Sequence, residues 1–408
     1  MKKSLIALAA LAATGAFAQS TVTLYGLADI GYGTHKTTGN EGRSIKSKGV
    51  MDGANAGSRI GFRGTEDLGG GLRAEFLVEQ GISPTNDELF GVRTAAAGHQ
   101  VDGFSAAGSA AALSGAAGGY SIGTNRQTYV GVISGMGTVR IGYQYTNLYE
   151  LGTLSGYALG SEGVPGADKA HLHANGVMGG TRANAITYIS PSFSGLTVRA
   201  QFGSGSAGRD TYESSAANAA SGLSVDKAVR TSIMAKYDAG KLSAAIAFTD
   251  NKISQTRPGG VGTAVNVYNA SAATTAIANT LERANKLTQI GASYDFGMAK
   301  IGLTINDGEA GSGSNTQISS YKANNLSVTV PFGALVPFAS MGKAKTTNDT
   351  TGVVSEDYKM TQYGARYLLS KRTTAYVMVG TTKNNAPAAV STGFTKDSKS
   401  VVGIAHSF

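Results

Sequence analysis

Hydrophobic and polar residues alternate along several segments of the chain. In residues 72–79, Leu-Arg-Ala-Glu-Phe-Leu-Val-Glu, apolar side chains occupy positions 72, 74, 76 and 78, and charged ones occupy positions 73, 75 and 79. Residues 196–202 and 242–248 repeat this pattern. A period of two residues places successive side chains on opposite faces of an extended strand. These segments are therefore predicted to be β-strands with one apolar and one polar face.

The spacing of such segments indicates a membrane barrel. Plausible strands begin near residues 22, 58, 71, 126, 138, 184, 196, 231, 241, 287, 299, 318, 334, 357, 373 and 398. Short turns, such as residues 67–70 and 134–137, alternate with long polar connections, notably residues 82–125 and 251–286. A transmembrane barrel carries short turns on one rim and long loops on the other, and it must close because hydrocarbon offers no partners to backbone groups. The chain is predicted to be all-β, a transmembrane antiparallel β-barrel of 16 strands with short periplasmic turns and long extracellular loops.

The N-terminus predicts export. Lys2 and Lys3 precede an apolar run at residues 5–13 and the triplet Ala-Phe-Ala at 16–18. This arrangement is typical of a secretory signal peptide, and the run is shorter than the ~20 apolar residues of a membrane-spanning helix. We therefore expect a signal peptide at residues 1–18 and a single barrel at residues 19–408.

Charge and cysteine content narrow the partners. Without residues 1–18 the chain keeps 33 basic and 26 acidic side chains, a formal charge of +7. No block of five or six Lys or Arg residues occurs, and an exported protein does not meet nucleic acid, so no nucleic-acid partner is expected. The chain has no Cys, which excludes disulfides and thiolate metal sites.

Candidate chemistry is sparse. Among the five histidines only His171 and His173 resemble a ligand pair, and no carboxylate orders them, so no metal site is predicted. His406 and Ser407 are adjacent in a predicted strand and face opposite sides, so they cannot form a catalytic pair. We expect neither an enzyme nor a cofactor.

Alternation also predicts which charges face the interior. A barrel of sixteen strands is too wide for side chains to fill, so its interior is an aqueous channel. An Arg on the lipid face near the midplane would cost about 2–4 kcal/mol, whereas in the lumen it stays hydrated. The arginines that lie opposite apolar neighbours, and are therefore predicted to face the lumen, are Arg59, Arg63, Arg73, Arg140 and Arg199.

Several ordered motifs resemble a known family. They are Thr-Val-Thr-Leu-Tyr-Gly at 21–26, Gly-Ser-Arg-Ile-Gly-Phe-Arg-Gly-Thr-Glu-Asp-Leu-Gly-Gly-Gly-Leu at 57–72, Gly-Thr-Val-Arg-Ile-Gly at 137–142, Tyr-Leu-Leu-Ser-Lys-Arg-Thr at 367–373, and a last strand that ends on Phe408. The triple glycine at 69–71 is a turn signal and not a phosphate loop, because no helix follows it. In this order the motifs resemble the general porins of Gram-negative bacteria, in particular the β-proteobacterial branch.

That resemblance implies a homotrimer in which the third external loop, here residues 146–182, folds into the pore. It further implies a basic wall at the constriction, matched here by Arg59, Arg126 and Arg182. Arg182 shares the parity of Ile186 and Tyr188, which look lipid-facing, and a bulge would resolve that conflict. The acidic side is assigned to Glu150, Glu162 and Asp168 of the third loop and to Glu79, which parity places on a strand wall, and the C-terminal assembly signal is assigned to Phe408. Two positions depart from the family pattern, since Tyr143 and Ala405 stand where arginines are common.

The predicted function is an outer-membrane channel for passive diffusion of small ions and hydrophilic solutes, embedded in outer-membrane lipid, with a weak preference for anions. A solute-selective channel of the same architecture and a structural or adhesive surface barrel are the alternatives. The Ala- and Gly-rich connection at residues 82–125 is predicted to be an external loop, with packing on a neighbouring subunit as the alternative.

Overall fold

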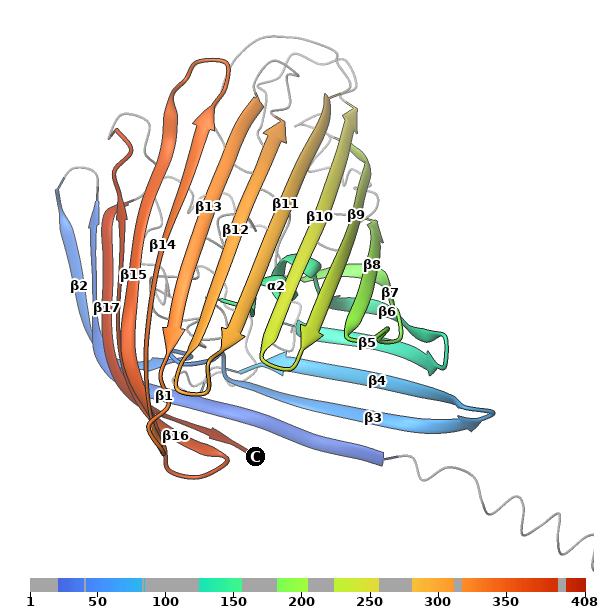
Figure 1. Cartoon of the computed structure of the whole chain (residues 1–408). Helices are drawn as coiled ribbons and strands as arrows, with labels where there is room; N and C mark the ends of the chain where they lie inside the picture. Colours follow the sequence, from blue (N-terminus) through green and yellow to red (C-terminus); the bar gives the residue numbers. More distant parts are fainter. Residues whose placement is uncertain are drawn as a thin grey trace, which may run out of the picture.

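The computed structural model describes residues 21–39, 42–82, 84, 125–155, 182–204, 224–256, 281–311, 318–387 and 394–408. Strands make up nearly all of these residues (Figure 1). The strands are β1 Thr21–Gly39, β2 Ser44–Asp52, β3 Arg59–Gly69, β4 Leu72–Gly81, β5 Asn125–Ser134, β6 Gly137–Tyr145, β7 Arg182–Ile189, β8 Leu196–Ser204, β9 Ser224–Ala239, β10 Leu242–Thr256, β11 Leu281–Asp295, β12 Lys300–Gly311, β13 Ile318–Thr329, β14 Leu335–Asn348, β15 Val354–Leu368, β16 Thr373–Asn384 and β17 Phe394–Ser407. One short helix, α2 Asn147–Gly152, follows β6. The predicted signal peptide lies outside the described residues.

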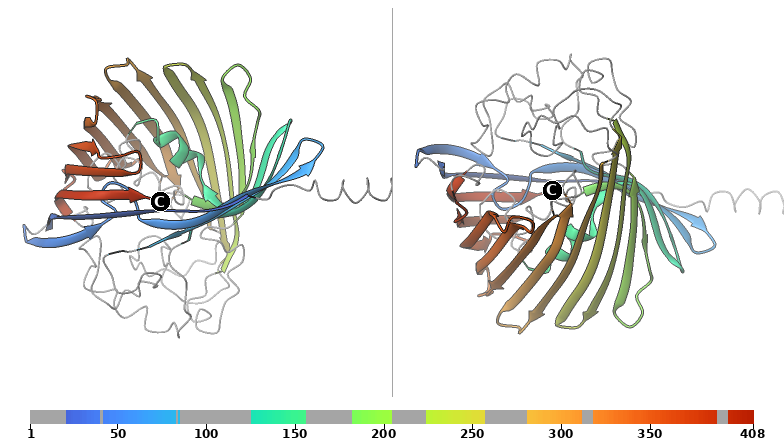
Figure 2. Two further views of the ribbon diagram at one scale, coloured as in Figure 1. Left: turned by 90° about the horizontal axis from the view of Figure 1, so that it is seen from below. Right: turned by 90° about the horizontal axis from the view of Figure 1, so that it is seen from above.

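The strands form one closed antiparallel sheet (Figures 1 and 2). From β3 onward each strand pairs with the next, and β1 pairs with β17 to close the ring. At the seam, backbone hydrogen bonds of 3.1 Å join Gly26 and Phe408 in both directions. A sheet closed in this way has no edge strand, so no row of backbone N–H and C=O groups is left without hydrogen-bond partners in the lipid.

In the ring of strands, the position next to β1 is shared by two strands, β2 and β3. Residues 21–27 of β1 pair with β3, and residues 30–38 of β1 pair with β2, on the same side of β1. The barrel therefore has sixteen positions, as predicted, although the sequence pattern missed β2 and started this position near residue 58. Two strands share this position because the residues between them, Gly-Ala-Asn-Ala-Gly-Ser at 53–58, leave the sheet. The Asp29 carboxylate accepts hydrogen bonds of 2.7 Å from the backbone amides of Asn55 and Ala56 there.

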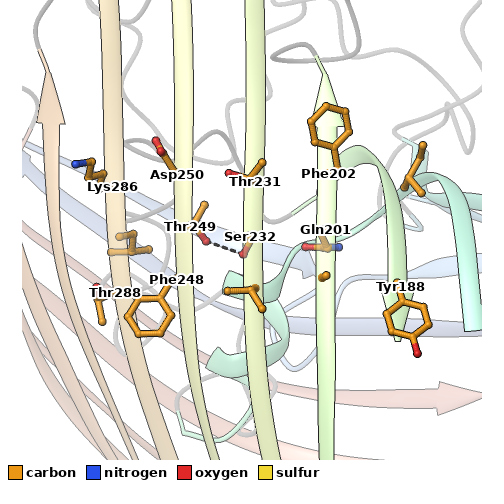
Figure 3. Close-up of a pocket in the computed structure, with 14 residues that line it drawn as sticks. Tyr188, Gln201, Phe202, Thr231, Ser232, Phe248, Thr249, Asp250, Lys286 and Thr288 are labelled. Carbon is orange, nitrogen blue, oxygen red and sulfur yellow. Dashed lines mark hydrogen bonds between the residues drawn. The ribbon is translucent and has the colours of Figure 1, made fainter. Parts of the chain in front are cut away.

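Side chains alternate between the two faces as predicted. On β8 to β10 the residues Phe202, Ile233 and Phe248 are about half exposed, whereas Gln201, Ser232 and Thr249 are buried. The two sets therefore point to opposite sides of the sheet, and Figure 3 shows Ser232 and Thr249 of the buried set joined by a hydrogen bond, which is 2.9 Å long. Exposed apolar side chains form the outer surface and polar ones line the inside, the arrangement expected of a barrel in lipid.

The connections are of two kinds. Short turns follow β3, β5, β7, β9, β11, β13 and β15, and the longest connections follow β4, β6, β8 and β10. The turn at residues 69–71 has three successive glycines with φ of +80°, +61° and +82°, a conformation that L side chains rarely adopt. The predicted connection at residues 251–286 is shorter than expected, because β10 continues to Thr256 and β11 begins at Leu281.

The third connection begins by crossing the inside of the barrel. The Thr146 side chain caps α2 by accepting from the Tyr149 amide, and α2 contacts β9, β10 and β11. Figure 2 shows α2 within the curve of the sheet. Among the residues that the structure describes, no helix is long and apolar enough to span a membrane.

Candidate functional site: an arginine cluster on the inner wall

Glu79 on β4 is the centre of a charged cluster that faces the inside of the barrel. Its carboxylate accepts a hydrogen bond of 2.8 Å from the Arg126 Nε and one of 2.9 Å from the Tyr25 hydroxyl. The Arg59 Nε lies 3.7 Å from the same carboxylate. The side chains of Glu79 and Arg126 are each 8% exposed. The cluster therefore joins β1, β3, β4 and β5 through one buried carboxylate.

Arg126 reaches this cluster because β5 contains a bulge. Simple alternation would place Arg126 on the side of Val130, which is 63% exposed on the outer surface. The register between β4 and β5 shifts, however, because Glu79 pairs with Gln127 whereas Gln80 pairs with Asn125. One extra residue in a strand reverses the direction of the side chains beyond it. The bulge turns Arg126 to the inside.

Arg182 reaches the cluster without a bulge, contrary to the sequence-based suggestion. The register of β6 and β7 is continuous from Thr138 and Ile189 to Tyr145 and Arg182. This last pair lies where the chain leaves the wall for α2. The Arg182 guanidinium lies 4.8 Å from the centre of the Tyr145 ring, and it donates a hydrogen bond of 3.3 Å to the Tyr145 hydroxyl.

Tyr145 links the two arginines to the third connection. Its hydroxyl also accepts a hydrogen bond of 3.0 Å from Arg126. Its ring stacks on Tyr149 of α2, with ring centres 3.8 Å apart and an interplanar angle of 6°. Arg59, Arg126 and Arg182, the three residues predicted for the basic wall, are therefore brought together around Glu79 and Tyr145.

Two further ion pairs extend the charged wall toward β8. The Arg140 guanidinium donates hydrogen bonds of 2.7 and 3.3 Å to Glu75, and its central carbon lies 4.7 Å from the centre of the Tyr129 ring. Arg199 on β8 pairs with Glu150 of α2 at 2.8 Å. The wall and the start of the third connection are thus joined by an ion pair as well as by a ring stack.

The remaining predicted residues lie in different places. Arg63 lies over the Tyr25 ring at 5.2 Å and is on the inner side. Arg73 is exposed beside the turn between β3 and β4, on the face that carries Glu75 and Glu79. Glu162 and Asp168 lie outside the described residues. Glu79 was grouped with the acidic side, but its carboxylate is held among arginines of the wall.

Two residues of the inner wall, Tyr145 and Arg366, were not predicted from the sequence. Tyr145 shares the parity of Ile141, which is 55% exposed on the outer surface, so alternation points it to lipid. Arg366 shares the parity of buried Gln362 and could have been found from that signal. Its Nε donates a hydrogen bond of 2.8 Å to the Asn55 side chain, which fastens residues 53–58 to β15.

Residues 53–58 also account for a missing charge at Ala405. Ala405 is 4% exposed, and it belongs to an apolar cluster with Leu27, Ala54 and Tyr376 on the inner side of the wall. An arginine at this position would be buried beneath the segment. The segment that leaves the second position of the barrel therefore occupies space that a lumen-facing arginine would need.

Comparisons with known proteins agree with this geometry. A family described as Gram-negative porin matches residues 4–387 of the chain. The outer membrane porin protein 32 of Delftia acidovorans is 29% identical over 404 residues, which cover 94% of this chain and 90% of that protein.

Two solved outer-membrane proteins have a similar fold. An anion-selective porin from Comamonas acidovorans has a TM-score of 0.65 at 21% identity, covering 96% of this chain and 100% of that one. The trimer form of OmpT, an outer membrane protein of Vibrio cholerae, has a TM-score of 0.58 at 15% identity, covering 95% and 99%.

Proposed function

The chain belongs to the Gram-negative porin family and is an outer-membrane channel for passive diffusion rather than an enzyme, and we propose that its arginine cluster makes the pore weakly anion-selective. The observation that carries this proposal is the convergence of Arg59, Arg126 and Arg182 at the place where the third connection enters the barrel. Charges at the narrow part of a pore act on every ion that passes.

Arginines outnumber carboxylates on this part of the wall. The inward-facing charges of β3 to β8, together with α2, are Arg59, Arg63, Arg73, Arg126, Arg140, Arg182 and Arg199 against Asp67, Glu75, Glu79 and Glu150. The excess of positive charge attracts anions and repels cations. Pairing with the carboxylates weakens this field, which is why we propose a weak preference.

The constriction is proposed to form between the arginine cluster and the third connection. α2 begins beside the cluster, where Tyr149 stacks on Tyr145, and it contacts β9, β10 and β11, so the connection runs from the charged strands to these strands. Glu150 on α2 supplies an acid on this connection, and Glu162 and Asp168 are proposed to add two more. Small hydrophilic solutes would pass between these two sets of charges.

We further propose a homotrimer in outer-membrane lipid. The fold is similar to that of an outer membrane protein whose structure is a trimer, and the outer surface carries many exposed apolar side chains. Because a trimer contains three pores, its conductance should change in groups of three equal steps, which single-channel recording in a planar bilayer detects. Purified protein that conducts only in single, independent steps would contradict the trimer.

The selectivity is tested by the reversal potential across a KCl gradient. At 0.15 M salt the screening length is ~8 Å and at 1 M it is ~3 Å, so the preference should be larger in dilute salt. We expect an anion-selective sign that weakens in Arg126→Gln and is unchanged in Lys286→Gln, which removes one positive charge from the outer surface. A cation-selective wild type in dilute salt would overturn the proposal.

A further inference from the structure

Four lysines form an unbroken row across the outer surface of β14 to β17. Lys343 pairs with Lys359, Lys359 pairs with Lys383, and Lys383 pairs with Lys396 in the registers of the sheet. All four are exposed, and their neighbours along each strand alternate to the inside. We call these four residues the lysine row.

The lysine row lies at the external border of the membrane. Lys359 is nine residues from Leu368 at the periplasmic end of β15, and Lys383 is ten residues from Thr373 at that end of β16. A tilted strand needs ~9–11 residues to cross the bilayer. On the periplasmic side of the row the outer surface carries exposed apolar side chains such as Tyr363 and Val402. The ammonium groups therefore lie at the level of the lipid headgroups in the outer leaflet.

The row is unfavourable without a negatively charged partner. Side chains directly opposite each other in antiparallel strands have Cβ atoms about 5 Å apart, and like charges in such pairs are destabilising. The row is continued by Asn324 beside Lys343 and by Thr38 beside Lys396, neither of which is charged. Within the described part of the chain, none of the four lysines forms an ion pair.

Other lysines at the same level of the barrel are matched by acids. On β10 to β12, Lys286 lies between Asp250 and Glu309 in register, and Figure 3 shows Asp250 and Lys286 side by side on the outer surface. The row next to the lysine row is made of Asp307, Lys322, Lys345 and Asp357, so two acids flank two lysines. The Lys322 and Asp307 charges lie 3.9 Å apart.

We propose that the lysine row binds the phosphate groups of the glycolipid in the outer leaflet. The row is positively charged, it is flat, and it lies at the membrane border. These properties fit the anionic headgroup of a lipid whose acyl chains run along the apolar surface on the periplasmic side of the row. Basic clusters beside a membrane-spanning segment bind anionic lipid in this way. A second copy of this chain fits less well, because none of the described outward-facing rows carries several acids without a lysine among them.

The test compares two double variants of the folded porin in detergent. Lys359→Gln with Lys383→Gln removes the centre of the row, and Lys286→Gln with Lys322→Gln removes two lysines that have acidic partners. Binding of purified lipid A that carries its phosphates is measured by native mass spectrometry. Each lysine of the row should contribute about fivefold in affinity, so the first variant should bind about 25-fold more weakly and the control less than threefold more weakly.

Two further measurements separate the proposed role from a structural one. Dephosphorylated lipid A should bind the wild type and both variants alike. Without lipid, the first variant should be more heat-stable than the wild type, because the repulsion is gone, and it should gain less stability when lipid A is added.

Equal weakening in both double variants, or no weakening in either, would refute lipid binding by the row. Loss of the oligomer in lipid-free detergent for the first variant alone would instead identify the row as a contact between copies, and would also overturn the proposal. Lys359→Arg with Lys383→Arg keeps the charge and should retain binding. Single-channel conductance of each variant verifies that the pore is folded, and it does not depend on the lipid result.

Discussion

The two sides of the inner wall differ in how they use polar residues. The side formed by β3 to β8 carries arginines paired with carboxylates and tyrosines. The side formed by β10 to β14 carries no charged inward-facing residue at residues 245–251, 287–293, 302–308, 321–329 and 338–344. Its inward-facing residues are apolar, amide or hydroxyl side chains and glycines. The third connection packs on this second side.

The difference follows from what each side contacts. Leu151 and Leu154 of the third connection pack with Ala245 and Ala247 of β10 on the uncharged side. Charged residues there would be buried beneath the connection, at the cost of taking a charge out of water. On the other side the arginines are paired with carboxylates, which stabilise their charge. The side formed by β10 to β14 is therefore the surface on which the third connection packs, which we call the seat. The side with the arginines produces the electric field in the pore.

Breaking the ion pair on the charged side should have the largest effect. Glu79→Gln leaves Arg126 buried without its carboxylate, and removing one partner of a buried ion pair costs about 3–5 kcal/mol of stability. The remaining arginines should also shift the reversal potential further toward anion selectivity. Urea unfolding in detergent and the reversal potential measure the two effects.

Glu66→Gln is the matched control for this substitution, since Glu66 is an exposed acid one residue from the inward-facing Thr65 on the same strand. It should change neither quantity appreciably. A shift toward cation selectivity in Glu79→Gln would show that Glu79 does not restrain the arginine field.

The sequence predicted the barrel more completely than the charged wall. Alternation requires only that one face meets lipid and the other water, so it placed Arg59, Arg63, Arg140 and Arg199 on the inner face. Alternation alone points Tyr145, where the chain leaves the wall, toward lipid, and it does not account for Arg126, where a bulge reverses the face. A bulge depends on the register with the partner strand, which a single strand's pattern does not contain.

The seat of the connection was likewise hidden from the sequence. The absence of charge from β10 to β14 is visible in the pattern, but its meaning appears only when α2 is seen to pack there. The interruption at residues 53–58 was also missed, because a short glycine- and alanine-rich segment gives no periodic signal. Its position is fixed by contacts with Asp29 and Arg366, which are distant in sequence.

Filling the seat on the uncharged side should have the next largest effect. A Cβ at Gly302 would lie in contact with the Leu154 carbonyl and 2.9 Å from the Ser155 Cα, so Gly302→Val must displace the third connection. Overpacking of this kind costs about 1–3 kcal/mol. We expect a higher and noisier single-channel conductance, because the connection no longer lies flat on the wall.

Gly49→Val is the control, since a Cβ at Gly49 meets nothing within 4 Å. Its conductance should match that of the wild type. A normal, quiet conductance in Gly302→Val would mean that the start of the third connection does not set the width of the pore.

The smallest effect is expected from one hydrogen bond that holds the connection to β9. The Asn147 side chain donates a bond of 3.0 Å to the Ser232 hydroxyl and is fully buried. Asn147→Ala should cost about 1 kcal/mol, because a net hydrogen bond contributes about that much, and it should leave the reversal potential unchanged since no charge is altered. Asn324→Ala, on the outer surface of β13, should change neither stability nor current noise. If Asn147→Ala altered the selectivity as strongly as Glu79→Gln, the division of the wall into a seat and a charged side would be wrong, because the seat would then be setting the field.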